Sequence, residues 1–197
     1  AAAIDGFGAD VVALQEVQRH QALHIARRLG WNCVWGPKHY PFGHLLWWRA
    51  EGLAILSPHR LDQRLHRSIS PGVHPYTHRR RVVLAATVHT PRRTLRVYDT
   101  HLAPESADER IAQARRIVRL TTSHSPELFV VAGDLNAHDE PELLREFRKA
   151  GLTDHGVDPT SPAVRPVQRI DYVLVPEQST DIDTVTPDGG QQWHELS

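Results

Sequence analysis

The chain has 197 residues, with 23 basic and 23 acidic side chains, 14 histidines, one cysteine and no methionine. A chain of this length buries roughly 70% of the surface of its unfolded form, so one core suffices without disulfides. The lone Cys33 excludes an internal disulfide and a zinc site built on cysteines. No apolar run approaches the roughly 18 residues of a membrane span, so we expect no transmembrane segment. The balanced charge gives no general attraction to nucleic acid or to an anionic membrane.

The chain starts at Ala1 and contains no methionine, so we expect a processed chain or a piece of a longer reading frame. Its compartment stays open between cytoplasmic and secreted, because a missing start can carry a signal peptide. The sequence has no internal repeat and no linker-like boundary. We therefore predict one domain over residues 1–197, and we expect a monomer.

The first half of the chain alternates between strand-like and helix-like apolar patterns. Residues 10–15 are short and almost wholly apolar, as in a buried strand. Residues 18–29 place apolar side chains on one helical face ahead of Gly30, which predicts a helix with a glycine stop. Further short strands are predicted at residues 32–36, 45–49 and 53–57. The polar stretch 58–80 is predicted to be an irregular surface loop.

The second half of the chain continues this alternation. Two β-branched runs at residues 81–89 and 95–102 flank Thr90-Pro91-Arg92-Arg93, which predicts a hairpin. Ser106 and Glu109 have the spacing of a capping box at the start of an amphipathic helix. The remaining predicted elements are a strand at 128–132, a helix capped by Asp139 and ended by Gly151, and strands at 170–175 and 182–185. Hairpins mixed with flanking helices favour an α/β protein with mixed sheets.

Polar side chains stand at the ends of these apolar strands or within them. They are Glu16 after VVALQ, His101 after VYDT, Asp134 and Asn136 after FVVAG, and Asp171 inside RIDYVLV. Charged groups avoid apolar surroundings unless they are partnered, so this pattern indicates a site. Taken singly, each residue also has a structural explanation. These are a helix cap for Glu16, a satisfied core imidazole for His101, an Asx turn for Asp134 and Asn136, and an ion pair with Arg169 for Asp171.

Five motifs occur in a fixed order, namely ADVVALQEV, EGLAILS, VYDTHL, VVAGDLN and RIDYVLV. In order and spacing they resemble the endonuclease/exonuclease/phosphatase superfamily, the deoxyribonuclease-I-like enzymes, over residues 9–175. Each motif is only moderately specific alone, and the set of five is much more so. The resemblance implies a four-layer α/β sandwich of two packed mixed β-sheets flanked by helices. It also implies metal-dependent hydrolysis of phosphate esters.

The resemblance assigns a role to each polar residue of the motifs. Glu16 matches the metal carboxylate, Asp134 the residue that orients or activates the attacking water, and Asn136 the residue that holds the phosphate and the site geometry. His101 matches a histidine that donates a hydrogen bond to the scissile phosphate, and Asp171 a carboxylate that orients a histidine further along the chain. The implied cofactor is Mg²⁺ or Mn²⁺, because Mg²⁺ prefers oxygen ligands and binds through one or two carboxylates and several waters.

The chain also departs from the family pattern at both ends. The family opens with a strand that ends in a metal-binding Asn, whereas residues 1–7 here have the pattern of the end of the helix that follows it. The family closes on Ser-Asp-His, and this chain stops at Ser197, with His194 out of position. We therefore expect a domain that is incomplete at both termini, lacks the first and last family strands and has little or no activity as this piece.

Substrate and class stay open at this stage. A nuclease, a lipid phosphodiesterase and an inositol-phosphate phosphatase share these motifs, so the substrate is a nucleic acid, a phospholipid or a phosphorylated small molecule. Its choice is expected in the loops at residues 37–43, 58–80 and 156–166. A non-catalytic binding protein with a lapsed site is the alternative class.

Two further groups of residues suggest weaker hypotheses. A zinc-dependent hydrolase would use His20 and His24, spaced i, i+4, or the loop histidines His66, His74 and His78. The run Arg79-Arg80-Arg81 would either contact phosphates or face solvent at the start of a strand.

Overall fold

A computed structural model describes residues 1–39, 49–70, 72, 76–122, 128–180 and 182–186. Its strands form two sheets. Sheet A has the order β1 (Val12–Gln18), β3 (Glu51–Ser57), β2 (Asn32–Pro37), and both pairs are antiparallel. Sheet B has the order β4 (Arg60–Ser68), β5 (Val82–His89), β6 (Thr94–His101), β7 (Phe129–Asp134), β9 (Asp171–Pro176), β8 (Leu152–Asp154). Sheet B is mixed, because β6 and β7 are parallel and its other pairs are antiparallel.

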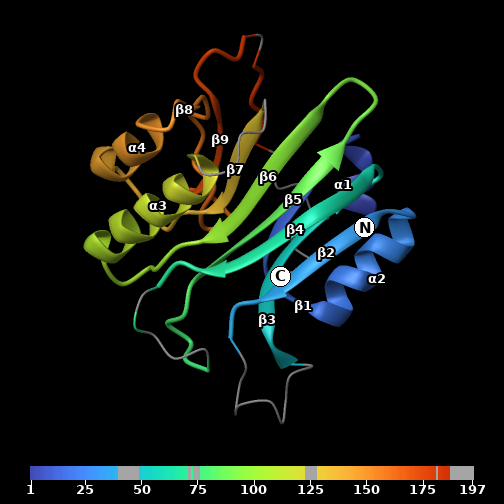
Figure 1. The fold of residues 1–197 in the computed structure, drawn as a ribbon. Coiled ribbons are helices and arrows are strands. Elements are labelled where there is room, and N and C mark those ends of the chain that lie inside the picture. The colour runs from blue at the N-terminus through green and yellow to red at the C-terminus, as the bar shows by residue number, and fades with distance from the viewer. Residues whose placement is uncertain (40–48, 71, 73–75, 123–127, 181, 187–197) are drawn as a thin grey trace.

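The helices of the described residues are α1 (Ala2–Gly6), α2 (Arg19–Leu29), α3 (Ala107–Thr122) and α4 (Pro141–Arg148). Three of these four helices, α2, α3 and α4, cover the outer faces of the two packed sheets (Figure 1). The helix α2 packs on sheet A, and α3 and α4 pack on sheet B. The four layers confirm the predicted α/β sandwich. No helix in the described part of the chain is long and apolar enough to cross a membrane.

Each interface between layers has its own apolar core. The strand β5 shows how one sequence supplies two of them, because alternate side chains point to opposite faces of a sheet. Val83 and Ala85 face the helices, and Val82 and Leu84 face sheet A. All four are buried, which explains why this strand reads as a continuous apolar run.

Most predicted elements are present, with boundaries shifted by one to three residues. The helix α2 ends as expected at Gly30, which adopts a left-handed conformation with φ of 70°. The hairpin between β5 and β6 closes through a hydrogen bond from the Thr90 N–H to the Arg93 carbonyl. The first half of the predicted capping box is formed by the N–H of Glu109 and the hydroxyl of Ser106, 3.4 Å apart.

Three predictions about local structure are wrong. The stretch 58–80 is not all loop, because β4 occupies Arg60–Ser68 as an edge strand of sheet B. The cap of α4 is Glu140 rather than Asp139, since the backbone of Asp139 is left-handed with φ of 53°. Residues 182–185 form no strand, and Val185 is 75% exposed, without the packing that stabilises a strand. The strand predicted at 45–49 lies almost wholly outside the described residues.

At Gly133 the backbone of β7 comes very close to the backbone of β6, near the ends of both strands. The φ of Gly133 is +136°, and a Cβ there would lie 2.0 Å from the carbonyl oxygen of Thr100 on β6. Only glycine fits this position without displacing the neighbouring backbone.

We therefore expect Gly133→Ala to lower the free energy of unfolding by about 3 kcal/mol, through steric overlap and backbone strain together. Urea unfolding monitored by circular dichroism measures this. Gly6→Ala is the matched control, because a Cβ at Gly6 meets no atom within 4 Å. Equal stability of the two variants would contradict the steric explanation.

Candidate active site

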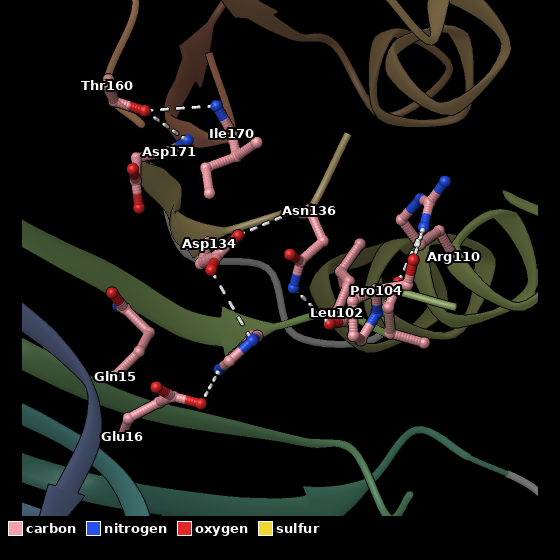
Figure 2. Close-up of polar contacts among 12 residues, drawn as sticks. Gln15, Glu16, Leu102, Pro104, Arg110, Asp134, Asn136, Thr160, Ile170 and Asp171 are labelled. Atoms are coloured by element: carbon pink, nitrogen blue, oxygen red, sulfur yellow. Dashed lines mark hydrogen bonds and ion pairs between the residues drawn. The ribbon is translucent and has the colours of Figure 1, made fainter. Parts of the chain in front are cut away.

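The ends of three neighbouring strands bring polar residues of distant sequence motifs together. The parallel register of β6 and β7 pairs His101 with Asp134, and the antiparallel register of β7 and β9 pairs Asp134 with Asp171. Asn136 follows two residues after Asp134. Four of the five predicted site residues therefore lie along one edge of sheet B, and Figure 2 shows Asp134, Asn136 and Asp171 there.

The fifth residue, Glu16, reaches this edge from sheet A. The register of β1 shifts between Leu14 and Val17, and Glu16 within this bulge has a left-handed backbone with φ of 54°. Bulges re-aim side chains, and strained backbone is often found at functional sites. Here the bulge turns Glu16 toward Asp134 (Figure 2). Its Oε1 lies 3.7 Å from Nδ1 of His101.

A hydrogen bond between the sheets supports this arrangement. Gln15, the neighbour of Glu16, donates from Nε2 to Oδ1 of Asp99 at a distance of 2.7 Å. Asp99 lies on β6, two residues before His101, and is fully buried. Burial raises the pKa of the Asp99 carboxyl well above its usual range, while the hydrogen bond from Gln15 acts in the opposite direction. The contact joins the strand that carries Glu16 to the strand that carries His101.

His101 is buried between two carboxylates without being hydrogen-bonded to either. Its residue is 7% exposed, and its Nε2 lies 3.6 Å from Oδ2 of Asp134. These separations are longer than hydrogen bonds, and Nδ1 has no hydrogen-bond partner. Burial, with the nearby charges of Arg81 and Lys38, lowers the pKa of His101 to about 3. The imidazole is therefore neutral at neutral pH and can donate one hydrogen bond to a ligand.

Asp134 is held in place by the backbone that follows it. Its Oδ1 accepts a hydrogen bond of 2.7 Å from the N–H of Asn136, whose φ is +49°. The side-chain amide of Asn136 donates to the carbonyl of Leu102 at 2.9 Å, which fixes the turn against the end of β6. Burial raises the pKa of Asp134 to about 6, opposed by the hydrogen bond from Asn136 and reinforced by the charges of Asp171 and Glu16.

Asp171 completes the row without an ion pair to any described residue. Its N–H donates to Oγ1 of Thr160 at 3.1 Å. The neighbouring Arg169 pairs with Asp154 instead and stacks over the ring of Tyr172, 4.5 Å from its centroid. The Asp171 carboxylate is thus left to act on the site.

The structural explanations given above for the single motif residues are only partly confirmed. The Asx turn of Asp134 and Asn136 is present, but it uses only one of the two carboxylate oxygens. The ion pair between Asp171 and Arg169 is not formed, and Gln18 rather than Glu16 caps α2. His101 is buried, but its Nδ1 has no hydrogen-bond partner among the described residues. The histidine that Asp171 is predicted to orient lies outside the described residues.

The acidic side of the site suits a hard cation that keeps most of its water ligands. Within the described residues no three His, Cys, Asp or Glu side chains stand close enough to hold a metal by themselves. Glu16 has a side chain that is 60% exposed and open to such an ion. Because Mg²⁺ is bound through one or two carboxylates and several waters, Glu16 fits it. Burial, and then the charges of Asp171 and Glu16, raise the pKa of Asp134, and a cation would relieve the repulsion among these carboxylates.

The proposed zinc ligands do not gather in the described part of the chain. His20 and His24 are exposed on α2, and no third ligand lies near them there. His66 donates a hydrogen bond from Nε2 to the carbonyl of Pro37, 3.0 Å away. His74 is outside the described residues.

Sequence patterns missed two cations beside the site. Lys38 and Arg81 are 8% and 4% exposed, although lysine and arginine usually face water. The sequence left Arg81 open between a phosphate contact and a solvent-facing position, and did not single out Lys38. An arginine that directly precedes a long apolar strand was the available signal.

Comparison with known proteins shows the family of the chain. A sequence model of the Endonuclease/Exonuclease/phosphatase family matches residues 1–191. The chain belongs to this family. Membership implies metal-dependent phosphoesterase chemistry in general, since the family includes phosphatases and nucleases. No curated protein sequence matches the chain.

Solved structures of the family share the fold at low sequence identity. A family protein from Leptotrichia buccalis has a TM-score of 0.66 and 18% identity over 88% of this chain and 78% of that one. The mannosyl-6-phosphatase of Bacteroides thetaiotaomicron has a TM-score of 0.70 and 14% identity, over 90% and 74%. The human nocturnin catalytic domain with bound sulfate has a TM-score of 0.64 and 20% identity, over 87% and 70%.

The raised pKa of Asp134 makes the stability of this family member depend on pH. Because the folded state disfavours the ionised carboxylate, the cost is absent below about pH 3.8, grows as pH rises and is complete above about pH 6. In EDTA, Asp134→Asn should therefore raise the free energy of unfolding at pH 8 by up to about 3 kcal/mol, and have little effect near pH 4.

Urea titrations at the two pH values measure this difference. Asp5→Asn is the matched control, because Asp5 is exposed on α1 and is not one of the predicted site residues. An equal effect of Asp134→Asn at both pH values would show that the carboxylate is not destabilised by its surroundings.

Proposed function

We propose that this family member hydrolyses phosphate esters with Mg²⁺ or Mn²⁺, by in-line attack of water on phosphorus. The observation that supports this most directly is the position of Glu16 and Asp134 on either side of the neutral His101 imidazole. A phosphate ester is anionic, so its hydrolysis needs positive charge at the phosphoryl oxygens and a fixed water. Acidic residues for the cation and neutral donors for the phosphate meet at this edge.

Glu16 would hold the cation, with Asp171 and Asp134 contributing negative charge nearby. When bound, the cation supplies positive charge that offsets the charge of the phosphate group. The bulge in β1 and the bond between Gln15 and Asp99 keep Glu16 in position for this. Binding through a single carboxylate and water leaves room for the substrate.

Asp134 would orient the attacking water and accept its proton. Its Oδ1 is occupied by the N–H of Asn136, and Oδ2 faces the site. A pKa of about 6 suits this task, because a general base works best when its pKa lies near the working pH.

His101 and Asn136 would contact the phosphate. A neutral imidazole donates one hydrogen bond to an oxygen that gains charge as the reaction proceeds, and a fixed donor needs no reorganisation. Asn136 keeps one amide N–H for the substrate, because the other is used by the carbonyl of Leu102. Asp171 would orient a histidine from outside the described residues.

The direct test is hydrolysis by the purified protein. We expect Mg²⁺-dependent release of product from bis-p-nitrophenyl phosphate, p-nitrophenyl phosphate or plasmid DNA. EDTA should abolish it. Asp134→Ala should lower kcat by about a hundredfold or more, because a general base contributes on that scale. Asp5→Ala, at an exposed position on α1, should leave the rate unchanged.

The pattern of substrates then separates the subclasses. Cleavage of the diester or of plasmid DNA favours a phosphodiesterase or nuclease, and release from the monoester alone favours a phosphatase. Activity that survives EDTA or Asp134→Ala would overturn the mechanism. If no substrate is hydrolysed but Mg²⁺ and phosphate still bind, the non-catalytic binding protein becomes the better description.

A further inference from the structure

Arg110 on α3 is a buried cation that donates hydrogen bonds from all three of its side-chain nitrogens. The residue is 7% exposed. Nε lies 3.0 Å from Oε2 of Glu140, and Nη2 donates to Oε1 of the same carboxylate. Nη1 donates to the carbonyl of Ala103 at 2.9 Å and to that of Pro104 at 3.1 Å. Paired bonds between a guanidinium and a carboxylate are strong and directional, so this contact fixes geometry as well as charge.

The partners of Arg110 belong to the two chain segments that carry the candidate site. Ala103 and Pro104 lie just after β6, whose last residue is the site histidine, and Figure 2 shows Arg110 reaching this segment. Glu140 follows Asn136 by four residues and is the N-cap of α4. One guanidinium therefore ties the segment after β6 to the segment after β7.

The segment from Asp134 to Glu140 contains two residues in the left-handed region. Asn136 and Asp139 have φ of 49° and 53°. Such conformations in residues other than glycine persist where the surrounding contacts hold them. Asp134, at one end, is held by the pairing of β7 with β6 and β9. Glu140, at the other end, is held by Arg110.

A second side chain of α3 holds the segment after β6 from its other side. Oε1 of Gln113 accepts a hydrogen bond of 3.0 Å from the N–H of Ala103. The N–H and the carbonyl of Ala103 are thus both bonded to side chains of α3. The preceding residue, Leu102, accepts the bond from the side-chain amide of Asn136. The helix therefore reaches Asn136 through both segments.

A second ion pair joins the same two helices without touching the site. Arg115 of α3 donates from Nη2 to Oε1 of Glu146 of α4 at 3.1 Å. The side chain of Arg115 is 55% exposed, whereas that of Arg110 is 9% exposed. Exposed ion pairs contribute little to stability, and this pair bonds neither segment that carries the candidate site.

We propose that Arg110 is a positioning residue that holds the turn of Asp134 and Asn136 in the place from which it acts on the phosphate. It does so by fixing the far end of this segment, at Glu140, against the segment that follows β6. The role of the turn in hydrolysis rests on the proposed function, whereas its position is measured without substrate.

Hydrogen exchange of the Asn136 amide, followed by nuclear magnetic resonance, tests this position, because that N–H donates to Asp134. In Arg110→Met we expect exchange to be faster by about tenfold or more, since the segment loses the anchor at its end. Leu135 is the internal reference, because its N–H donates to the carbonyl of Ile170 instead. Its exchange should change by less than about threefold.

Arg115→Met is the matched control, because it removes the other ion pair between α3 and α4. It should leave the exchange of Asn136 as in the wild type. Arg110→Lys keeps the charge but loses the paired donors, so we expect an intermediate rate. Glu140→Gln keeps the size of the side chain and loses its charge, and should also speed exchange. This variant decides the question if Arg110→Met does not fold.

Hydrolysis of bis-p-nitrophenyl phosphate tests the consequence for the reaction. Arg110→Met should lower kcat by about tenfold or more, because small displacements of catalytic groups are costly. Arg115→Met should keep the wild-type kcat. If the wild type hydrolyses no substrate, the proposed function fails, and the exchange rates alone decide the role of Arg110.

Wild-type exchange of Asn136 in both Arg110→Met and Glu140→Gln would overturn the proposal. With an active wild type, an unchanged kcat in Arg110→Met would also overturn it. The same holds for an equal loss of kcat in Arg110→Met and Arg115→Met, which would indicate a role in helix packing alone.

Discussion

The pairing of β6, β7 and β9 is the constraint on which the candidate site depends. The hydrogen-bond register is strongly specified, because a slip by one residue turns every side chain of the strand to the other face of the sheet. With His101 opposite Asp134, and Asp134 opposite Asp171, three motifs from distant parts of the chain end at one edge. Gly133 permits this pairing, because any larger residue would meet the carbonyl of Thr100. The position of Asp134 at this edge therefore depends on the close packing of the residue before it, Gly133.

The second requirement is that the two sheets agree in position. Apolar side chains hold the two sheets together, but hydrophobic contact is not directional and does not fix their relative alignment. The hydrogen bond from Gln15 to the buried Asp99 adds a specific alignment. It sets the bulge with Glu16 beside His101, and a cation held by Glu16 would then lie beside Asp134. Low exposure at His101 and Asp134 strengthens each charge interaction, because water does not screen it there.

Periodic patterns predicted the elements that bury an apolar face. They failed where contacts with distant parts of the chain determine the structure. The apolar run of β5 and the amphipathic face of α3 are visible in sequence because each must bury one face. The strand β4 was missed because its outer residues are polar and its register shifts between Asp62 and Leu65, which hides the alternation. The motifs predicted Glu16, His101, Asp134, Asn136 and Asp171 as site residues, and the fold brings these five residues together. The burial of Arg81 was not predictable, since it depends on the segment after β4 and on Gln113 of α3, which donates to Ser70.

The resulting site combines three kinds of polar group with different tasks. Carboxylates lie on both sides of a neutral imidazole, and two buried cations lie nearby. Such a combination of groups suits the proposed hydrolysis of an ester whose phosphate is anionic and whose attacking water must lose a proton. The central claim is that Glu16 binds the divalent cation.

Titration of the protein with Mn²⁺, followed by electron paramagnetic resonance, tests this claim most directly. We expect one Mn²⁺ site that is weakened by about tenfold or more in Glu16→Gln, because the variant loses a charged ligand. Glu177→Gln, at an exposed position after β9, should bind Mn²⁺ as the wild type does. Unchanged Mn²⁺ affinity in Glu16→Gln would contradict the account.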